Sequence, residues 1–198
     1  MKVLIACEYS GTVRDAFISK GHEAISCDLL PTDSPGPHYQ GDVYGMLDEE
    51  WDLIIAHPPC TCLTVAGNST YGEGKPRYKE RLDSVKWTVE LWNRCKSMSD
   101  KVCFENPVGV LQRLGCMPKP NYVQPYQFGH PEQKKTGLML HGLPPLVETN
   151  NVYDHMMTLP KRERERLLYL PPSPDRWKIR STTFKGIANA MADQWGCL

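Results

Sequence analysis

The fold of this chain is restricted most by a series of short apolar runs, each of which ends in a loop of polar residues. Lys2–Ala6 and Glu23–Cys27 have the length and composition of buried strands, and Gly11–Lys20 between them carries apolar residues at helical spacing. A further run, Asp52–Ala56, is followed by prolines. This strand–helix–strand beginning predicts an α/β fold with a mostly parallel sheet and helices on both faces. Because ligands of such sheets bind beyond the carboxyl ends of the strands, we expect the functional residues in the loops that follow them.

Later segments continue the same pattern. A helix is predicted from Pro76 to about Met98, and strands are predicted over Lys101–Glu105 and Thr136–Leu140. A final helix is predicted within Thr182–Trp195, where apolar residues share one stripe.

The length indicates one domain. With 198 residues, the chain suits a single domain over residues 1–198. Within it, residues 141–180 carry many prolines and little periodicity, so we expect them to form a small irregular lobe. Residues 181–198 are expected to supply the C-terminal helix that completes the domain.

Charge is balanced in total but not along the chain. The 23 basic and 23 acidic side chains cancel, yet residues 1–60 hold 3 basic and 10 acidic ones, and residues 161–198 hold 8 and 4. Apart from chance variation of a solvated surface, this gradient favours an acidic first part around a small ligand and a basic second part that faces a polyanion. No apolar run approaches the roughly 18 residues of a membrane span, and the start lacks the layout of a signal peptide, so we expect no membrane association.

The eight cysteines indicate a reducing compartment rather than a metal site. Cys7, Cys27 and Cys103 lie inside apolar runs, where a thiol serves as a small buried side chain. No Cys-x-x-Cys pair exists, and the close pair Cys60 and Cys62 has no second pair at zinc-site spacing. We therefore predict a cytoplasmic protein without a metal site.

A cysteine and a carboxylate stand at the ends of two predicted strands. Cys60 follows the two prolines after Asp52–Ala56, which would hold its thiol rigidly for nucleophilic attack, and Glu105 ends a later strand. Together they are what covalent attack on a pyrimidine requires: a thiolate that adds to C6 and a carboxyl that protonates N3, which leaves C5 nucleophilic. Taken alone, each has a plainer interpretation as a buried cysteine beside a turn or an acidic loop residue. Cys62 is a second candidate nucleophile, without an adjacent proline.

The loops after the first two strands have features of a cofactor site. Cys7–Gly11 links strand to helix, and its glycine lets the chain approach a ligand closely. The segment lacks Gly-x-Gly-x-x-Gly, which disfavours a dinucleotide. Asp28 ends the second strand, where an acid can hold ribose hydroxyls, and Asp42 is placed to accept from an adenine amino group. As single residues, both acids also suit turns or caps.

Taken in order, these motifs resemble those of the DNA (cytosine-5) methyltransferases. The short motifs of that family have counterparts here in the same sequence: Ala6–Gly11, Asp28, Asp42, Pro59-Cys60, Glu105–Pro107 and Gly186–Ala190. The resemblance covers residues 3–140 and 181–195. It extends to the short methylase-like proteins of bacteriophages.

The resemblance implies a Rossmann-like methyltransferase fold that uses S-adenosyl-L-methionine (AdoMet). The implied reaction moves a methyl group to C5 of cytosine in DNA through a covalent adduct between Cys60 and C6. The implied catalytic residues are Cys60, Glu105, Asn106 and Pro59. The implied cofactor residues lie in the strand-end loops and the final motif: Cys7, Glu8, Ser10, Gly11, Asp28, Asp42, Pro58, Asn189 and Ala190. The bacteriophage likeness implies the cytoplasm of a bacterial host.

Part of the family pattern is missing. Residues 141–180 stand where the family has a large target-recognition domain, and its Gln-x-Arg-x-Arg motif is reduced to Gln133–Thr136, where Lys135 is the candidate contact. Duplex DNA is the expected substrate, and a separate protein could supply target recognition. Phosphate contacts are predicted for basic residues of a loop, the reduced motif and the tail: Lys75, Arg77, Lys79, Arg81, Lys135, Arg176, Lys178, Arg180 and Lys185. Each of them also suits a solvated surface.

Three alternatives stay open at this point. The same chemistry could act on a free cytidine nucleotide, single-stranded DNA or RNA. A degenerate relative could bind AdoMet or DNA without turnover, as a decoy or regulator, although such a binder has no need of Cys60. His57–Cys60 also resembles the Asp/Asn-Pro-Pro-aromatic motif of amino-group methyltransferases, but a cysteine cannot stack on a base and a histidine is a poorer acceptor.

Overall fold

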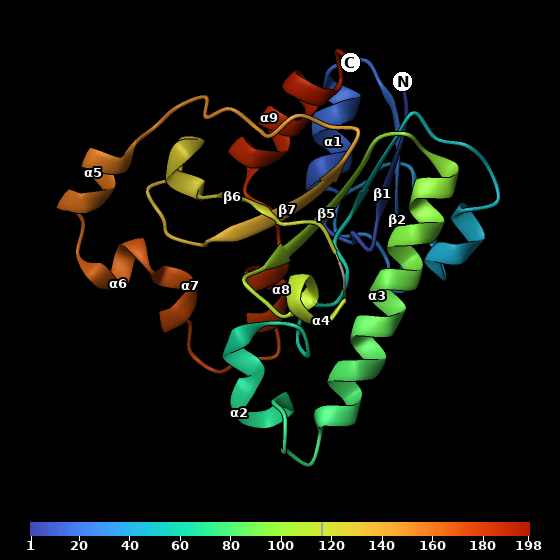
Figure 1. Ribbon diagram of the computed structural model, residues 1–198. Coiled ribbons are helices and arrows are strands. Elements are labelled where there is room, and N and C mark those ends of the chain that lie inside the picture. The colour runs from blue at the N-terminus through green and yellow to red at the C-terminus, as the bar shows by residue number, and fades with distance from the viewer. Residues whose placement is uncertain (116) are drawn as a thin grey trace.

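A sheet forms the centre of the computed structural model, which describes residues 1–115 and 117–198. Its strands are β1 (Lys2–Ala6), β2 (Glu23–Asp28), β3 (His38–Gln40), β4 (Leu53–Ala56), β5 (Val102–Pro107), β6 (Asn121–Val123) and β7 (Thr136–His141). They lie in the order β3-β2-β1-β4-β5-β7-β6 (Figure 1). Strands β1 to β5 are parallel, whereas β7 runs antiparallel to both β5 and β6. The prediction of a Rossmann-like α/β fold with a mostly parallel sheet is confirmed.

Helices connect the strands and form the outer layers. The three longest are α1 (Thr12–Ser19), α3 (Tyr78–Met98) and α9 (Lys185–Trp195). The shorter turns are η1 (Val43–Met46), η2 (Val65–Gly67), α2 (Asn68–Tyr71), α4 (Leu111–Leu114), η3 (Pro125–Gln127), α5 (Tyr153–Thr158), α6 (Lys161–Arg164), α7 (Arg166–Tyr169) and α8 (Arg176–Ser181). Within the two described ranges, none of the helices combines the length and the apolar character that a membrane crossing requires.

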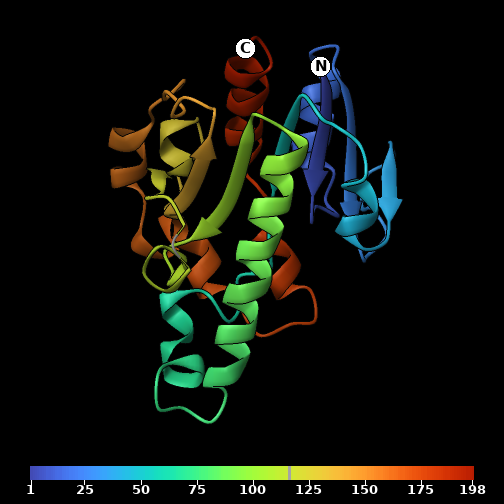
Figure 2. The same cartoon turned by 45° about the vertical axis from the view of Figure 1, so that its right-hand side comes forward.

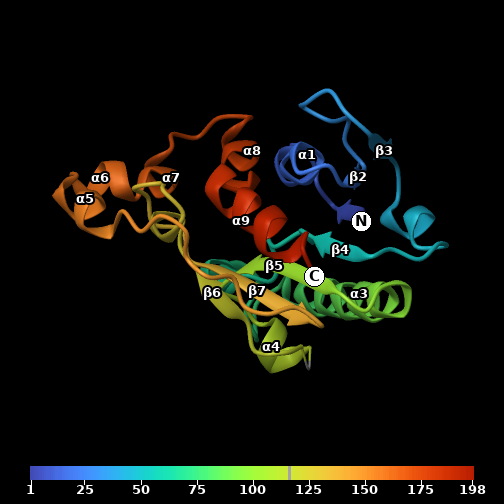
Figure 3. The ribbon, with the colours of Figure 1, turned by 90° about the horizontal axis from the view of Figure 1, so that it is seen from above.

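Both faces of the sheet are covered, because alternate side chains of each buried strand point to opposite faces. Leu4 and Phe104 lie in one apolar layer with α3, whose Trp92 meets Phe104 edge-on at 5.1 Å between ring centroids. Ile5 and Ile55 lie in the other layer, with α1 and α9. The view from above shows α3 on one side of the sheet and α1 and α9 on the other (Figure 3). The prediction of helices on both faces is therefore also confirmed.

The strand order reverses between β1 and β4. β1 pairs with β2 on one side and with β4 on the other. The chain segments that follow β1 and β4 therefore lead toward opposite edges of the sheet. Such a reversal opens a crevice beyond the carboxyl ends of the two central strands. β5 runs toward the same end of the molecule, where α2 and α8 lie (Figure 2). The loops that the sequence analysis singled out therefore border one edge of the sheet.

Two strands and several boundaries differ from the prediction. β3 and β6 were not predicted, because a strand of three residues has too few positions to show an alternating pattern. The helix expected from Pro76 begins at Tyr78, and the one expected within Thr182–Trp195 begins at Lys185. Helix ends depend on local capping, which periodicity alone does not locate.

Residues 141–180, expected as an irregular lobe, contain the short helices α5, α6 and α7 and most of α8. α8 returns to the edge of the sheet. There, Tyr9 Oη lies 3.0 Å from the Lys178 carbonyl oxygen and 3.0 Å from Ser181 Oγ. The rings of Tyr9 and Trp177 are 5.6 Å apart. α8 therefore packs against the loop that follows β1, beside the predicted cofactor residues.

Candidate active site

The turn that carries Cys60 is fastened to the neighbouring strand. β4 and β5 pair in parallel, and Asn106 Nδ2 on β5 donates to the carbonyl oxygen of Pro58 at 3.2 Å. Pro58 is buried and Pro59 is exposed. Because adjacent strand residues point to opposite faces, the Asn106 side chain faces away from that of Glu105. Asn106 and Pro58 therefore hold the turn in place beneath Cys60.

Cys60 shares its surroundings with one carboxylate and two cations. Burial raises the pKa of the Cys60 thiol, and the nearby charge of Glu105 raises it further. Lys134 and Arg180 act in the opposite direction, because a cation stabilises a thiolate. The thiol is therefore protonated in the resting protein at neutral pH. Once it has lost its proton, the two cations stabilise the thiolate. The charge of Glu105 therefore reaches Cys60, and the roles of the two residues stay predictions.

Glu105 is held as a carboxylate. Burial acts to raise the pKa of Glu105, but the hydrogen bond and charge of His57, together with the charge of Lys134, outweigh it. The pKa of this carboxyl consequently lies below its ordinary value. His57 Nδ1 lies 3.4 Å from Glu105 Oε2, and the two side chains are only 10% and 15% exposed. His57 entered the sequence analysis only as part of an alternative motif, and it belongs to the site through this contact.

Lys134, and not Lys135, enters the site. Burial lowers the pKa of Lys134, while the charges of Glu105 and Cys60 act to raise it. Lys135 is exposed, with Nζ 4.3 Å from the centre of the Tyr122 ring. Lys135 therefore lies apart from Cys60 and Glu105, and its contact with nucleic acid stays a prediction. Two adjacent lysines look alike in a sequence, and only the path of the loop before β7 decides which one points inward.

The polar residues after β1 are used by the fold itself. Glu8 is buried, and its carboxylate accepts from the backbone N–H groups of Val13 (2.7 Å) and Arg14 (3.2 Å). Ser10 Oγ donates to Glu8 Oε1 at 3.1 Å. Gly11 begins α1 at φ 72°, and a Cβ there would collide with the guanidinium of Arg14. Because the Glu8 carboxylate occupies the N-terminus of α1, a ligand phosphate is disfavoured at this point.

The other strand-end residues also have local roles. Cys7 adopts a left-handed conformation with φ 57°, which is unusual for a residue with a Cβ, and burial raises its pKa, so the thiol is neutral. Asp28 Oδ1 accepts from Leu30 N at 2.9 Å, and Asp42 Oδ1 accepts from Tyr44 N at 3.0 Å. A carboxylate has several acceptor sites, so these turn contacts leave capacity for a ligand.

The final motif lies on α9, which packs against α1. Asn189 is exposed, whereas Ala190 is buried in the apolar layer that α1 and α9 form over the sheet. The side chain of Ala190 is therefore a packing contact, and the role of this residue in cofactor binding stays a prediction.

Most of the predicted phosphate contacts lie on the surface, and some already have partners. Arg77 pairs with Glu80 and Lys79 with Asp83, each at 2.6 Å, and both pairs are exposed. Lys178 pairs with Asp33 at 3.3 Å. Exposed pairs of this kind contribute little to stability, so a phosphate can displace them.

The remaining basic residues divide by exposure. Lys75 and Lys185 are exposed. Arg176 and Arg180 are half-buried, and they donate to the carbonyl oxygens of Leu170 (3.0 Å) and Leu167 (3.4 Å). Arg176 and Arg180 are therefore held against α7.

Arg81 differs from the other basic residues. Its side chain is buried, and its guanidinium donates to Cys62 O (2.7 Å), Asn68 Oδ1 (2.8 Å) and Thr64 O (3.1 Å). Arg81 is therefore not available to a phosphate, which corrects its predicted role. It ties α3 to the loop that follows Cys60, and a charged residue within a helical pattern gives no sign of such burial.

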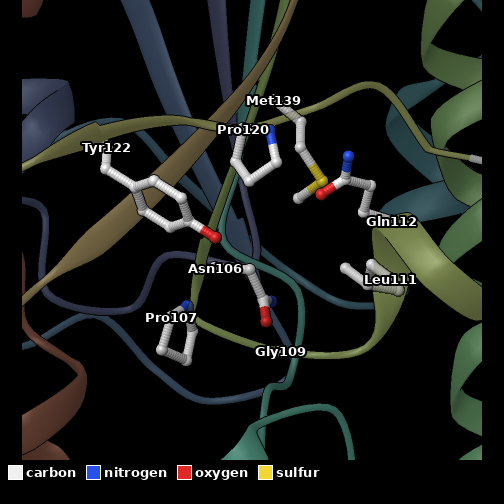
Figure 4. A pocket seen from close by; sticks show the side chains of 8 residues that line it. All are labelled: Asn106, Pro107, Gly109, Leu111, Gln112, Pro120, Tyr122 and Met139. Carbon is white, nitrogen blue, oxygen red and sulfur yellow. The ribbon is translucent and has the colours of Figure 1, made fainter.

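A small cavity lies between the end of β5, α4 and β6 (Figure 4). The side chains of Asn106 and Tyr122 border it, from β5 and β6. Within the described ranges, the buried Asn106 Oδ1 has no hydrogen-bond partner. The cavity measures about 20 Å³, which suits one water-sized group and is far too small for a base or a nucleoside.

Comparisons with known proteins reach only distant structures. No family model and no curated protein matches the chain. A solved candidate DNA modification methyltransferase, encoded within a prophage of E. coli, superposes with a TM-score of 0.43 at 15% identity over 80% of this chain. WbdD, crystallised with a kinase inhibitor, superposes with a TM-score of 0.41 at 14% identity over 69% of this chain. The matched parts cover 55% and 35% of those two chains.

Proposed function

We propose that this protein transfers a methyl group from AdoMet to C5 of cytosine in DNA, through a covalent adduct between Cys60 Sγ and C6. The observation that carries the proposal is the proximity of the Cys60 turn, after β4, to Glu105 on the neighbouring strand β5. His57, three residues before Cys60, lies 3.4 Å from Glu105, and the charge of Glu105 acts on the thiol. A half-buried thiol, a carboxylate and a cation within mutual electrostatic reach are typical of a reactive site. The motif order of the sequence supports the same chemistry.

The edge formed by β1, β2 and β3 suits a cofactor that has no phosphate. The carboxylate of Glu8 fills the helix end where a phosphate would bind, and AdoMet carries a sulfonium cation instead. Asp28 would hold ribose hydroxyls, and Leu29 beside it is 72% exposed and offers an apolar surface. Asp42 would accept from the adenine amino group. When bound there, AdoMet supplies an electrophilic methyl group.

The residues around Cys60 account for the other steps. The target cytosine has to swing out of the helix, because stacking covers the faces of its ring. Cys60 Sγ adds to C6 while Glu105, once protonated, gives a proton to N3, which leaves C5 nucleophilic. Lys134 and Arg180 stabilise the thiolate before it adds. After C5 is methylated, a base or water removes the C5 proton, N3 returns its proton to Glu105, and the bond to Cys60 breaks.

The surface beside this site suits a polyanion. Lys75, Arg77 and Lys79 lie at the start of α3, and Lys178 and Arg180 lie on α8, at the end of the molecule where β5 terminates (Figure 2). We propose that phosphates of a duplex contact both groups. A separate protein that supplies target recognition is a further proposed partner. Phosphate contacts of this kind make affinity fall as salt rises.

Covalent trapping tests the proposal. Purified protein is incubated with AdoMet and duplex DNA that contains 5-fluorocytosine, whose fluorine cannot leave as a proton does. We expect an adduct of protein and DNA by denaturing mass spectrometry, absent with Cys60→Ser and absent without AdoMet. Cys62→Ser is the matched control and should retain the adduct, because Cys62 lacks the rigid proline before it.

Other substrates are tested in parallel. An adduct with single-stranded DNA, RNA or a fluorinated nucleotide, but none with duplex, would retain the chemistry and change the substrate. No adduct with any of the four, together with measurable AdoMet binding, would contradict methyl transfer and support a non-catalytic binder. Methyl transfer that survives in Cys60→Ala would contradict the covalent mechanism.

A further inference from the structure

The resting charge of Glu105 is at odds with its part in the reaction. Protonation of N3 requires a neutral carboxyl, whereas the surroundings of Glu105 favour the carboxylate. A carboxylate has no proton to give, so one has to reach Glu105 when the cytosine arrives. A group that both contacts Glu105 and can carry a proton at neutral pH would meet this need.

His57 is placed to be that group. Its Nδ1 lies 3.4 Å from Glu105 Oε2. Since an ionised carboxylate only accepts hydrogen bonds, Nδ1 has to carry a proton in this contact. The His57 side chain is 10% exposed, and within the described ranges its other nitrogen, Nε2, is buried without a hydrogen-bond partner. A buried polar atom of this kind is rare in folded proteins and is expected at sites that move protons.

The backbone fixes this contact. His57 N donates to the carbonyl oxygen of Ala6 at 2.9 Å, which continues the pairing of β4 with β1 beyond the end of the strand. Pro58 follows directly and restricts the His57 backbone. His57 is therefore set by two neighbouring elements, β1 and the two-proline turn, and faces Glu105 on β5.

We propose that His57 is a positioning residue that holds a proton against Glu105 and delivers it when cytosine binds. His57 starts as an imidazolium, and its proton passes from Nδ1 to the Glu105 carboxylate and from the resulting carboxyl to N3. At the same time Cys60, as a thiolate whose own proton has passed to solvent, forms the bond to C6. This leaves neutral His57, a Glu105 carboxylate and a protonated N3. The N3 proton returns to the pair when the adduct breaks down. The inference rests on the proposed function, and it adds a proton source to it.

Other charged groups face the same pair and affect its titration. Lys134 from the loop before β7 favours the Glu105 carboxylate, and Arg180 from α8 adds positive charge near Cys60. Cys103 on β5 remains neutral, because burial raises its pKa. Cys60 itself ionises as pH rises, which favours attack in the wild type and in a His57 variant alike. The contribution of His57 is therefore measured against a variant in which these other groups are unchanged.

His57→Asn is that variant. The Asn side-chain N–H group can replace Nδ1–H as a donor to Glu105, but it cannot release a proton. We expect the rate of adduct formation on 5-fluorocytosine DNA to fall about 100-fold at pH 6. The ratio of the wild-type rate to the variant rate should then decrease as pH rises to 9, because a neutral imidazole no longer has the extra proton to deliver. His155→Asn, at an exposed position on α5, should match the wild type throughout.

A ratio that stays constant with pH, or a His57→Asn variant as fast as the wild type, would overturn the proposal, since a donor alone would then suffice. His57→Ala should be slow as well, and circular dichroism shows whether each variant is folded. A wild type that forms no adduct counts against the proposed function, and the location of the proton is then decided by a second measurement.

That measurement is independent of turnover. Long-range ¹H–¹⁵N spectra of histidine-labelled protein report which ring nitrogen is protonated at pH 7. We expect Nδ1 of His57 to carry a proton in the wild type, and this preference to disappear in Glu105→Met. An unprotonated Nδ1 in the wild type, or identical spectra of His57 in both proteins, would overturn the proposal whether or not the protein methylates DNA.

Discussion

The two halves of the functional edge use their charged residues in different ways. Beside β1 and β2, the charged groups are satisfied by the fold: Glu8 caps α1, and Arg14, which is fully buried, donates to Ser26 Oγ and to the carbonyl oxygens of Ser34 and Pro35. Beside β4 and β5, buried polar atoms have no hydrogen-bond partner within the described ranges, namely His57 Nε2 and Asn106 Oδ1.

The pKa values are shifted in both halves, but in different ways. Beside β1, burial and neighbouring charge act in the same direction on Cys7 and keep its thiol neutral. Glu105, Lys134 and Cys60 all depart from their ordinary pKa values, because burial and neighbouring charges compete at each of them. Groups that are satisfied stabilise a fixed shape, which suits the binding of a small cofactor. Groups on which burial and neighbouring charges act in opposite directions change protonation readily, which suits proton transfer in a reaction. The comparison therefore separates a half of the edge that maintains shape from a half that, in the proposed function, carries out the reaction.

The strongest test replaces one carboxylate in each half of the edge by an amide, at Glu105 and at Glu8. Glu105→Gln should slow adduct formation about 10²- to 10⁴-fold with little loss of stability, because the amide cannot act as an acid. Glu8→Gln should instead lower the free energy of unfolding by about 1 kcal/mol, because a neutral amide caps the helix less well than a carboxylate. Adduct kinetics and chemical denaturation measure the two effects, with the exposed Glu90→Gln as the control for charge. Equal effects of the two substitutions on rate and stability would remove the distinction.

Replacing the two buried arginines, Arg14 and Arg81, by methionine tests the difference between the two halves further. Arg14→Met should lower the free energy of unfolding by about 3 kcal/mol, because it leaves several buried acceptors unpaired. Arg81→Met should chiefly loosen the loop after Cys60 and reduce the adduct rate about tenfold, since misplaced groups react slowly. Urea denaturation and adduct kinetics on both variants check this. A catalytic defect confined to Arg14→Met would contradict it.

The reactivity of Cys60 should depend on its charged neighbours. Because its pKa is raised, alkylation by iodoacetamide should increase about tenfold per pH unit from pH 7 to 9 without levelling off. Lys134→Met should slow alkylation severalfold at each pH, because the cation that lowers the pKa of the thiol is lost. Peptide mapping by mass spectrometry separates Cys60 from the exposed Cys197. A plateau below pH 8, or faster alkylation in the variant, would contradict this account.

The smallest expected effect is on acid stability. The pKa of Glu105 is lower in the folded protein than its unfolded value of about 4.3, so its ionised form stabilises the native state above that pH. This contribution is lost as pH falls through the folded pKa. The difference in free energy of unfolding between the wild type and Glu105→Gln should therefore shrink from pH 6 to pH 3, while Glu90→Gln shows no such trend. Denaturation curves at each pH measure this difference in free energy of unfolding. A difference that widens as pH falls would contradict the prediction.

The sequence by itself determined the frame of the molecule and the reactive pair. Runs such as Leu53–Ala56 are apolar at every position, and such runs form buried parallel strands wherever helices can cover both faces. Because the carboxyl ends of parallel strands meet at one edge, the positions of Cys60 and Glu105 after β4 and at the end of β5 already brought them together. Nothing beyond the order of strands was needed for that inference.

Only the tertiary structure decided which charged residues are buried and what they contact. Arg81 lies in a helical pattern that suits solvent, yet its guanidinium is enclosed by the loop after Cys60. Lys134 and Lys135 are indistinguishable as neighbours, and His57 has no sequence signal that links it to a carboxylate 48 residues later. Long charged side chains take their burial and their partners from whatever the fold packs around them. A local sequence pattern contains periodicity and turn chemistry, but it contains no information about those distant neighbours.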